Sequence, residues 1–148
     1  GRHVLSAQIL LRIVLPSMEA AGYGRIINVL STSVREPIAN LGVSNTIRGA
    51  MASWAKSVSK ELGPGITINN VLPGFTDTER LASLKTEVAE RMGTSEDAVH
   101  EMWLDRVPEG RLGRPEEVGG VIAFLASPAG AYVRGQSLAV DGGRLNSI

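Results

Sequence analysis

The sequence of 148 residues contains no cysteine and only two histidines, His3 and His100. The absence of cysteine excludes disulfides and thiolate metal ligands. With two distant histidines a zinc site would depend on carboxylates, so no metal site is expected. Basic residues number 15 and acidic residues also number 15. Because there is no excess of positive charge, nucleic acid is not expected as the main partner.

Long apolar runs are also missing. The most apolar segment, residues 4–15, is interrupted by Gln8 and Arg12. We therefore expect no stretch long enough to span a bilayer and no membrane partner. No small-residue cleavage site follows this segment, so a signal peptide is not expected either. These features predict a soluble cytoplasmic protein, and the length fits one domain.

The patterns that are present alternate between helix and strand. Helical spacing of apolar residues predicts helices over residues 4–18, 44–62, 77–92, 95–105 and 115–125, with Ser44 and Ser95 as N-caps. Short apolar runs at residues 25–30, 66–72 and 137–140 are typical of strands buried on both faces. Strands that alternate with helices predict an α/β layered fold with a parallel sheet.

Three short parallel strands make a small sheet for this fold class. Parallel sheets are normally covered by helices on both faces and by further strands at their edges. The predicted order opens on a helix with no strand before it. We therefore expect these 148 residues to be part of a larger α/β unit or half of a complex.

Six segments in order resemble the short-chain dehydrogenase/reductase family. They are residues 24–31 (GRIINVLS), 56–62 (KSVSKEL), 69–74 (NNVLPG), 110–117 (GRLGRPEE), 124–128 (FLASP) and 135–143 (GQSLAVDGG). The most similar members are reductases of 3-oxoacyl carrier-protein thioesters and similar carbonyls. The resemblance implies a Rossmann-like, doubly wound parallel sheet of seven strands. It also implies NAD or NADP as cofactor and hydride transfer at a carbonyl or secondary alcohol carbon.

The resemblance also implies how the chain is organised. Residues 1–148 correspond to the C-terminal part of one such domain, carrying its fifth to seventh strands. The glycine-rich turn that receives the cofactor's pyrophosphate is not found in these residues, so the N-terminal cofactor-binding half is expected to be absent from them. Residues 79–109 correspond to the family's substrate lid, within which Met92, Met102, Trp103 and Leu104 either line an apolar pocket or simply pack.

The family's catalytic residues are a serine at a strand end and a tyrosine followed four residues later by a lysine. The resemblance places the serine at Ser31, the tyrosine position at Ser44 and the lysine position at Arg48. No tyrosine in this sequence has a lysine four residues later. A serine hydroxyl is a far weaker acid than a phenol, and an arginine stays protonated and cannot relay a proton.

Two interpretations of this departure remain open. In the first, Arg48 holds the cofactor's ribose or a substrate anion, Ser31 and Ser44 bind the carbonyl oxygen, and water supplies the proton. In the second, Ser44 is a plain N-cap, Arg48 is a solvated helix residue, and the chain is a catalytically silent subunit with a binding or assembly role. Ser31 alone is also compatible with a turn serine at a strand end.

The segment Pro73–Thr78 resembles the family's nicotinamide loop. The resemblance assigns cofactor binding to Pro73, Gly74, Thr76 and Thr78, with Arg48 as a further cofactor ligand. The alternative for this segment is a helix cap, made by Thr76 or Asp77.

The expected partners follow from the same resemblance. The substrate is a small carbonyl or alcohol. The helices over residues 4–18 and 44–62 are expected to pack against a second copy in a homodimer or homotetramer, and the broad apolar surface of the first helix supports this.

Overall fold

The computed structural model describes residues 2–147, and its centre is a three-stranded parallel sheet. The strands are β1 (Gly24–Val29), β2 (Ile66–Pro73) and β3 (Ser137–Val140), in the order β1-β2-β3. Asn28 lies opposite Asn70, and Asn70 lies opposite Ser137. Each is linked to the next by a side-chain hydrogen bond of 2.9 Å. The predicted α/β class and parallel sheet are confirmed.

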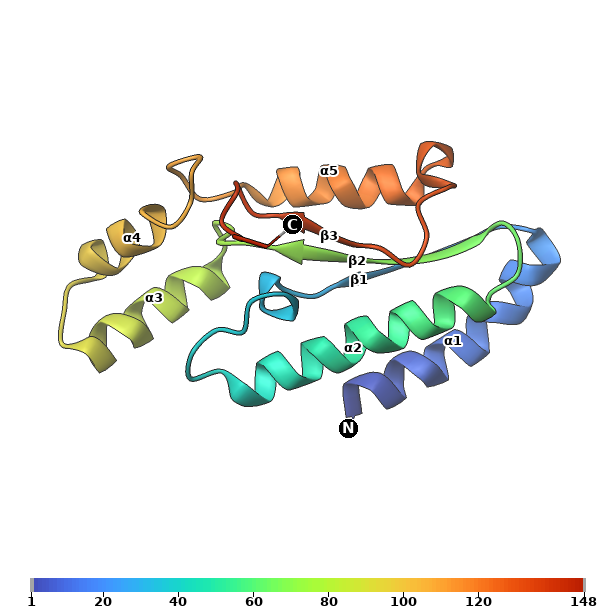
Figure 1. Cartoon of the computed structure of the whole chain (residues 1–148), viewed down its shortest axis with the longest axis horizontal. Coiled ribbons are helices and arrows are strands. Elements are labelled where there is room, and N and C mark those ends of the chain that lie inside the picture. Colours follow the sequence, from blue (N-terminus) through green and yellow to red (C-terminus); the bar gives the residue numbers. More distant parts are fainter. Residues whose placement is uncertain (1, 148) are drawn as a thin grey trace.

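Helices cover both faces of this sheet (Figure 1). Helices α1 (Arg2–Ala21) and α2 (Gly42–Glu61) lie on one face, and α5 (Pro115–Ala126) lies on the other. Helices α3 (Glu79–Met92) and α4 (Glu96–Leu104) extend beyond the carboxyl ends of the strands. Two short 3-10 helices, η1 (Thr32–Val34) and η2 (Pro128–Gly130), were not predicted from the sequence.

The core lies on both sides of β2, which is buried along nearly its whole length. On the α1–α2 side, the buried apolar residues are Leu11, Ala55, Val58, Leu62, Ile66 and Ile68. On the α5 side they are Val71, Val118 and Leu125. The unbroken apolar run of this strand is thus explained by burial on two faces.

Helices α3 and α4 form a small packing unit of their own. Val88, Ala89, Val99 and Trp103 are buried together, and the Trp103 ring stacks on Phe75 with centroids 5.1 Å apart. Met92, in contrast, is more than half exposed. The packing interpretation of Trp103 is therefore confirmed, and the ring joins this unit to the loop that follows β2.

Helix α1 is mostly exposed in this single chain. Leu11 is its only buried residue in the part of the chain that the structure describes. An apolar face formed by Leu5, Ile9, Leu10, Ile13 and Val14 is open to solvent. By length and composition alone, α1 is also sufficient to cross a membrane, so the expectation of no such stretch was wrong. One such helix is weak evidence, because mostly buried core helices and signal sequences near an N-terminus pass the same test. In α1, Leu11, Leu15 and Met18 pack into the core against the sheet, although only 6% of the apolar window is buried.

Candidate active site

A cavity of about 440 Å³ opens at the carboxyl ends of β1 and β2. Side chains that follow these two strands meet there because parallel strands end at the same edge of a sheet. The apolar part of the wall is made by Val29, Leu30, Leu81, Leu84 and Val118. Six of the seven residues singled out from the sequence also line it: Ser31, Arg48, Pro73, Gly74, Thr76 and Thr78.

Ser31 lies where β1 gives way to η1, and its backbone is extended, with φ −170° and ψ 156°. Its Oγ accepts a hydrogen bond from the amide of Ser33 at 3.1 Å, which makes it the N-cap of η1. This bond uses a lone pair of the oxygen and leaves the hydroxyl proton free to be donated. The turn role and a role as donor to a bound oxygen are therefore compatible.

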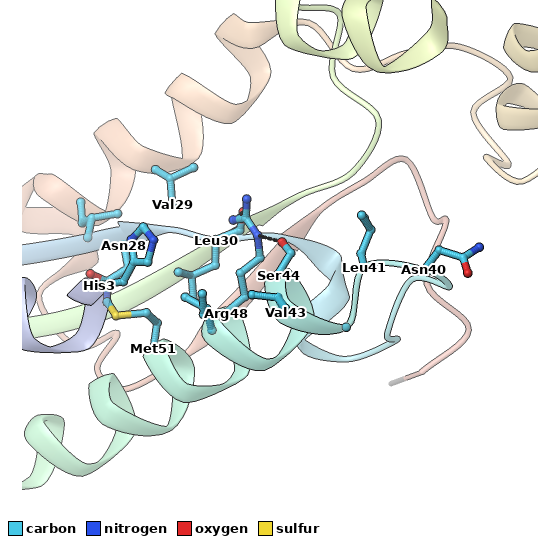
Figure 2. A pocket seen from close by; sticks show the side chains of 13 residues that line it. His3, Asn28, Val29, Leu30, Asn40, Leu41, Val43, Ser44, Arg48 and Met51 are labelled. Atoms are coloured by element: carbon cyan, nitrogen blue, oxygen red, sulfur yellow. Dashed lines mark hydrogen bonds between the residues drawn. The ribbon is translucent and has the colours of Figure 1, made fainter. Parts of the chain in front are cut away.

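Arg48 lies in the second turn of α2 and points back at the end of β1 (Figure 2). Its Nη1 donates to the carbonyl oxygen of Leu30, and its Nε donates to Ser44 Oγ at 3.4 Å. The side chain is half-buried and makes no ion pair with any carboxylate in residues 2–147. The interpretation of Arg48 as a solvated helix residue is therefore wrong.

Ser44 does not cap α2. The helix begins at Gly42, its N-cap position is Leu41, and no side chain bonds to the free amides there. Ser44 lies inside the first turn, where its hydroxyl faces Arg48. It lines a second, larger cavity of about 1070 Å³, together with Arg48, His3 and Asn28. Arg48 lines both cavities, as do Val29 and Leu30, and Ser44 is the one predicted site residue that lies outside the smaller cavity.

The loop from Pro73 to Thr78 is held by its own hydroxyl groups. Thr76 Oγ1 donates to the carbonyl oxygen of Gly74 at 3.3 Å, and Thr78 Oγ1 donates to that of Thr76 at 3.3 Å. Thr78 Oγ1 also accepts from the amide of Leu81 and so caps α3. The expected start of this helix at residue 77 and the expected cap by Thr76 or Asp77 are thus corrected to Glu79 and Thr78.

A clamp on this loop was not predicted from the sequence, although its residues lie in the segment 110–117. Glu117 accepts two hydrogen bonds from Arg111, both 2.8 Å, and one from the amide of Arg114 at 2.8 Å. The Arg111 guanidinium, followed by the Arg114 amide, lowers the pKa of Glu117 to about 2. Gly113, inside this turn, donates to Phe75 O at 2.9 Å and accepts from the Asp77 amide at 2.8 Å. The charged turn therefore holds the loop in place.

The cavity fits the nicotinamide end of a dinucleotide. Its apolar walls suit a flat ring, and the hydroxyls of Ser31, Thr76 and Thr78 suit a carboxamide and a sugar. The start of α3 also lines the cavity, through Thr78, Arg80 and Leu81. A cavity at the carboxyl ends of parallel strands is the usual ligand site of a Rossmann-like α/β domain, and this fold and site define that class of domain.

The comparisons with known proteins agree. A family model described as enoyl-(acyl carrier protein) reductase matches residues 3–144. The short-chain reductase protein NovJ of Streptomyces niveus is 38% identical over 130 residues, which cover 86% of this chain and 47% of NovJ. The 3-oxoacyl-[acyl-carrier-protein] reductase FabG of Vibrio cholerae is 38% identical over 135 residues, which cover 89% of this chain and 50% of FabG.

Among solved structures, the L-sorbose reductase of Gluconobacter frateurii, complexed with NADPH and L-sorbose, matches with a TM-score of 0.89 and 28% identity. The match covers 99% of this chain and 56% of that one. This chain belongs to the short-chain dehydrogenase/reductase family. It spans about half the length of the relatives that it matches.

Proposed function

We propose that this chain is the C-terminal part of an NAD(P)-dependent oxidoreductase that transfers hydride to or from a carbonyl or secondary alcohol. The observation that carries the proposal is the cavity in which Ser31 and Arg48 meet the loop from Pro73 to Thr78. Relatives and structural neighbours named as reductases, one of them with NADPH bound, support it.

Each of the residues that line the cavity has a distinct role in this reaction. Pro73, Gly74, Thr76 and Thr78 orient the carboxamide of the cofactor, which supplies or takes up hydride when bound. Ser31 donates its free hydroxyl proton as a hydrogen bond to the substrate oxygen. Arg48 places a permanent positive charge beside that oxygen, where negative charge develops, and contacts either the ribose or a substrate anion.

Proton supply is the step in which this site differs from its family. Arg48 cannot release a proton at neutral pH, and Ser44 has a hydroxyl of high pKa. Ser44 Oγ lies 3.4 Å from Arg48 Nε on the wall of the larger cavity, which is wide enough to admit water. Water that enters through this cavity is the proton source, and Ser44 and Arg48 orient it.

The free edge of β1 is where the rest of the domain joins. Within the described residues β1 pairs only with β2. Gly24 and Leu30 direct their amides to β2. Since alternate residues face opposite sides in a parallel ladder, Arg25, Ile27 and Val29 present theirs to the open edge. We expect a parallel strand from the remaining length of the relatives to pair here and to close the larger cavity, completing the doubly wound sheet.

Assembly and location complete the proposal. The exposed apolar face of α1 and the adjacent surface of α2 pack against a second copy in a homodimer or homotetramer. Lid residues 79–109 close over the substrate, and the protein is cytoplasmic.

The test is an assay of the full-length protein for oxidation of NADH and NADPH with a panel of small ketones and 3-oxoacyl thioesters. Ser31→Ala is expected to lower kcat by on the order of 10²-fold, because it removes a donor to the developing oxyanion. Ser57→Ala, on the exposed face of α2, is the matched control and should leave kcat unchanged. No turnover of any carbonyl by the wild-type protein would contradict the proposal.

A catalytically silent subunit with a binding or assembly role is the second candidate, favoured by the absent tyrosine–lysine pair. The double variant Ser44→Tyr/Arg48→Lys distinguishes the two. Activity that appears only in this variant supports the silent subunit. Activity in the wild-type protein at least equal to that of the variant rules the silent subunit out.

A further inference from the structure

The end of β3 and the segment after it contact both loops that line the smaller cavity, the turn after β1 and the loop from Pro73 to Thr78. The carbonyl of Val140 accepts from the amide of Gly74 at 3.0 Å. The Asp141 carboxylate then folds the chain back on itself by accepting from the amides of Gly143 at 3.1 Å and Leu145 at 2.9 Å. A Cβ at Gly74 would lie 2.7 Å from that of Asp141, so this segment and the loop after β2 are in close contact.

Arg144 follows this turn and contacts the neighbours of both functional loops. Its Nη1 donates to Thr32 Oγ1 at 2.7 Å, and Thr32 directly follows Ser31. The same guanidinium lies over the ring of Phe75, 4.8 Å from its centroid, and Phe75 lies between Gly74 and Thr76. The Arg144 side chain, 112 residues after Thr32, therefore links the turn that carries Ser31 (residues 31–36, the serine turn) to the loop from Pro73 to Thr78 (the cofactor loop).

The half-buried position of the Arg144 guanidinium costs free energy, which indicates that its contacts to Thr32 and Phe75 are stabilising. Thr32 is 2% exposed, and the Nε of Arg144 is buried without a hydrogen-bond partner in the part of the chain that the structure describes. Burial of the guanidinium, together with the nearby charge of Arg106, lowers the pKa of Arg144, while Glu36 and Asp141 act in the opposite direction. Partly burying a cation with an unpaired donor costs free energy, which the contacts to Thr32 and Phe75 offset together with the charges of Glu36 and Asp141.

A second link joins the turn that carries Ser31 to the C-terminal segment. Glu36 Oε1 accepts from the amides of Asn146 at 2.7 Å and Ser147 at 3.1 Å. Within residues 2–147, the turn that carries Ser31 is thus attached to the C-terminal segment through Glu36 and through Arg144, and of these two side chains it is Arg144 that also contacts the loop from Pro73 to Thr78.

We propose that Arg144 is a positioning residue that fixes Ser31 relative to the loop from Pro73 to Thr78. It touches neither substrate nor cofactor and acts through Thr32 and Phe75. This inference rests on the proposed function. In that function Ser31, the donor to the substrate oxygen, must keep a fixed distance from the loop that orients the cofactor. Displacements of about 1 Å between such groups cost on the order of 10²-fold in rate.

The test compares three variants of the full-length protein: Arg144→Met, Arg144→Lys and Thr32→Val. The first keeps the packing volume but removes the hydrogen bond and the charge, the second keeps the charge but not the planar group, and the third removes only the acceptor. Arg106→Met is the matched control, since Arg106 lines the same surface cavity as Arg144 but is exposed.

Amide hydrogen exchange is the first readout, because it does not depend on activity. Arg144→Met and Thr32→Val should speed exchange in peptides covering residues 31–36, and Arg144→Met should also speed it in residues 73–78. Arg106→Met should change neither. Unchanged exchange in both loops of Arg144→Met overturns the inference.

Kinetics are the second readout. Arg144→Met should lower kcat at least tenfold with a smaller change in KM, and Arg144→Lys should recover only part of this loss. A variant with lower thermal stability but unchanged kcat shows a merely structural residue and also overturns the inference. If the wild-type protein turns over no carbonyl, the proposed function fails, and hydrogen exchange still decides whether Arg144 joins the two loops.

Discussion

The Nη1 of Arg48 donates to the carbonyl oxygen of Leu30, the residue directly before Ser31. The bond joins the second turn of α2 to the end of β1. It turns the guanidinium toward the cavity at the carboxyl ends of the strands and leaves its outer nitrogen free of partners within the described residues. Arg48 is therefore held as a charge in the wall of this cavity, as the proposed function requires.

Removing that charge should reduce activity. We expect Arg48→Met to lower kcat by on the order of 10²-fold, since it removes a positive charge beside the reacting oxygen. Arg48→Lys should retain part of the activity because the ammonium keeps the charge but not the fork of donors. Steady-state kinetics of the full-length protein provide the measurement.

Arg80→Met is the matched control for Arg48. Arg80 lines the same cavity, but it is largely exposed and pairs with Glu87 at 3.5 Å. Its loss should change kcat less than about threefold, as expected for an exposed ion pair. Equal losses in the two variants would show that the cavity needs positive charge in general and not Arg48 in particular.

Arg134 should be important for stability rather than activity. Its Nε donates to Ser59 O at 2.6 Å, its Nη1 to Gly63 O at 3.2 Å, and its Nη2 to Leu62 O. These carbonyls lie at or just after the last turn of α2, where no helical partner exists. Arg134→Met should lower the free energy of unfolding by about 2 kcal/mol, as expected for lost hydrogen bonds to a charged group.

Denaturant unfolding measures this loss. Lys60→Met, in the last turn of the same helix, controls for charge near the helix C-terminus and should cost about 0.5 kcal/mol or less. The prediction fails if Lys60→Met and Arg134→Met are equally destabilised.

Glu117 should make stability depend on pH in the acid range. Its pKa is lowered from 4.5 to about 2 in the folded chain, first by Arg111 and then by the Arg114 amide. A lowered pKa means that the stabilising contribution is complete above pH 4.5 and is lost as pH falls toward 2. The wild-type protein should therefore lose more stability over this range than Glu117→Gln.

Thermal unfolding at several pH values tests this expectation. Glu116→Gln, one residue earlier in α5, is the control and should follow the wild-type curve. Parallel curves for the wild-type protein and Glu117→Gln would contradict a role for this carboxylate in the clamp.

The exposed face of α1 should form a subunit interface. Ile13 is 68% exposed and lies on this face with Leu5 and Ile9. Ile13→Glu should weaken self-association tenfold or more, on the order of what a central interface residue contributes. Sedimentation of the full-length protein provides the measurement. Met92→Glu, on the exposed end of α3, should leave the assembly intact, and a wild-type protein that is monomeric would contradict the expectation.

The elements were predictable where one local cause determines them. The run from Ile66 to Leu72 is a strand because both of its faces are covered, and Ser95 caps α4 through a bond to Ala98 at 3.1 Å. Ser31 and Thr78 could be placed in one cavity because parallel strands end at one edge of the sheet. The resemblance supplied which of these residues to examine.

The remaining features depend on contacts that no local pattern encodes. The spacing of apolar residues in α2 is the same whether the helix begins at Gly42 or at Ser44, so the wrong N-cap was predicted. The link from Arg144 to Thr32 joins residues 112 positions apart, and the fork of Arg134 reaches over 70 residues back. The apolar face of α1 could be recognised from the sequence, but nothing in the sequence distinguishes a partner within this chain from one outside it.

Native mass spectrometry of the protein purified from its source, with and without NAD(H) and NADP(H), tests the central claim most directly. The account predicts that the species containing this chain gains the mass of one dinucleotide per complete domain, whether the second half is on the same polypeptide or on another. A species that travels only with itself and takes up no dinucleotide would contradict the oxidoreductase proposal and favour the assembly role.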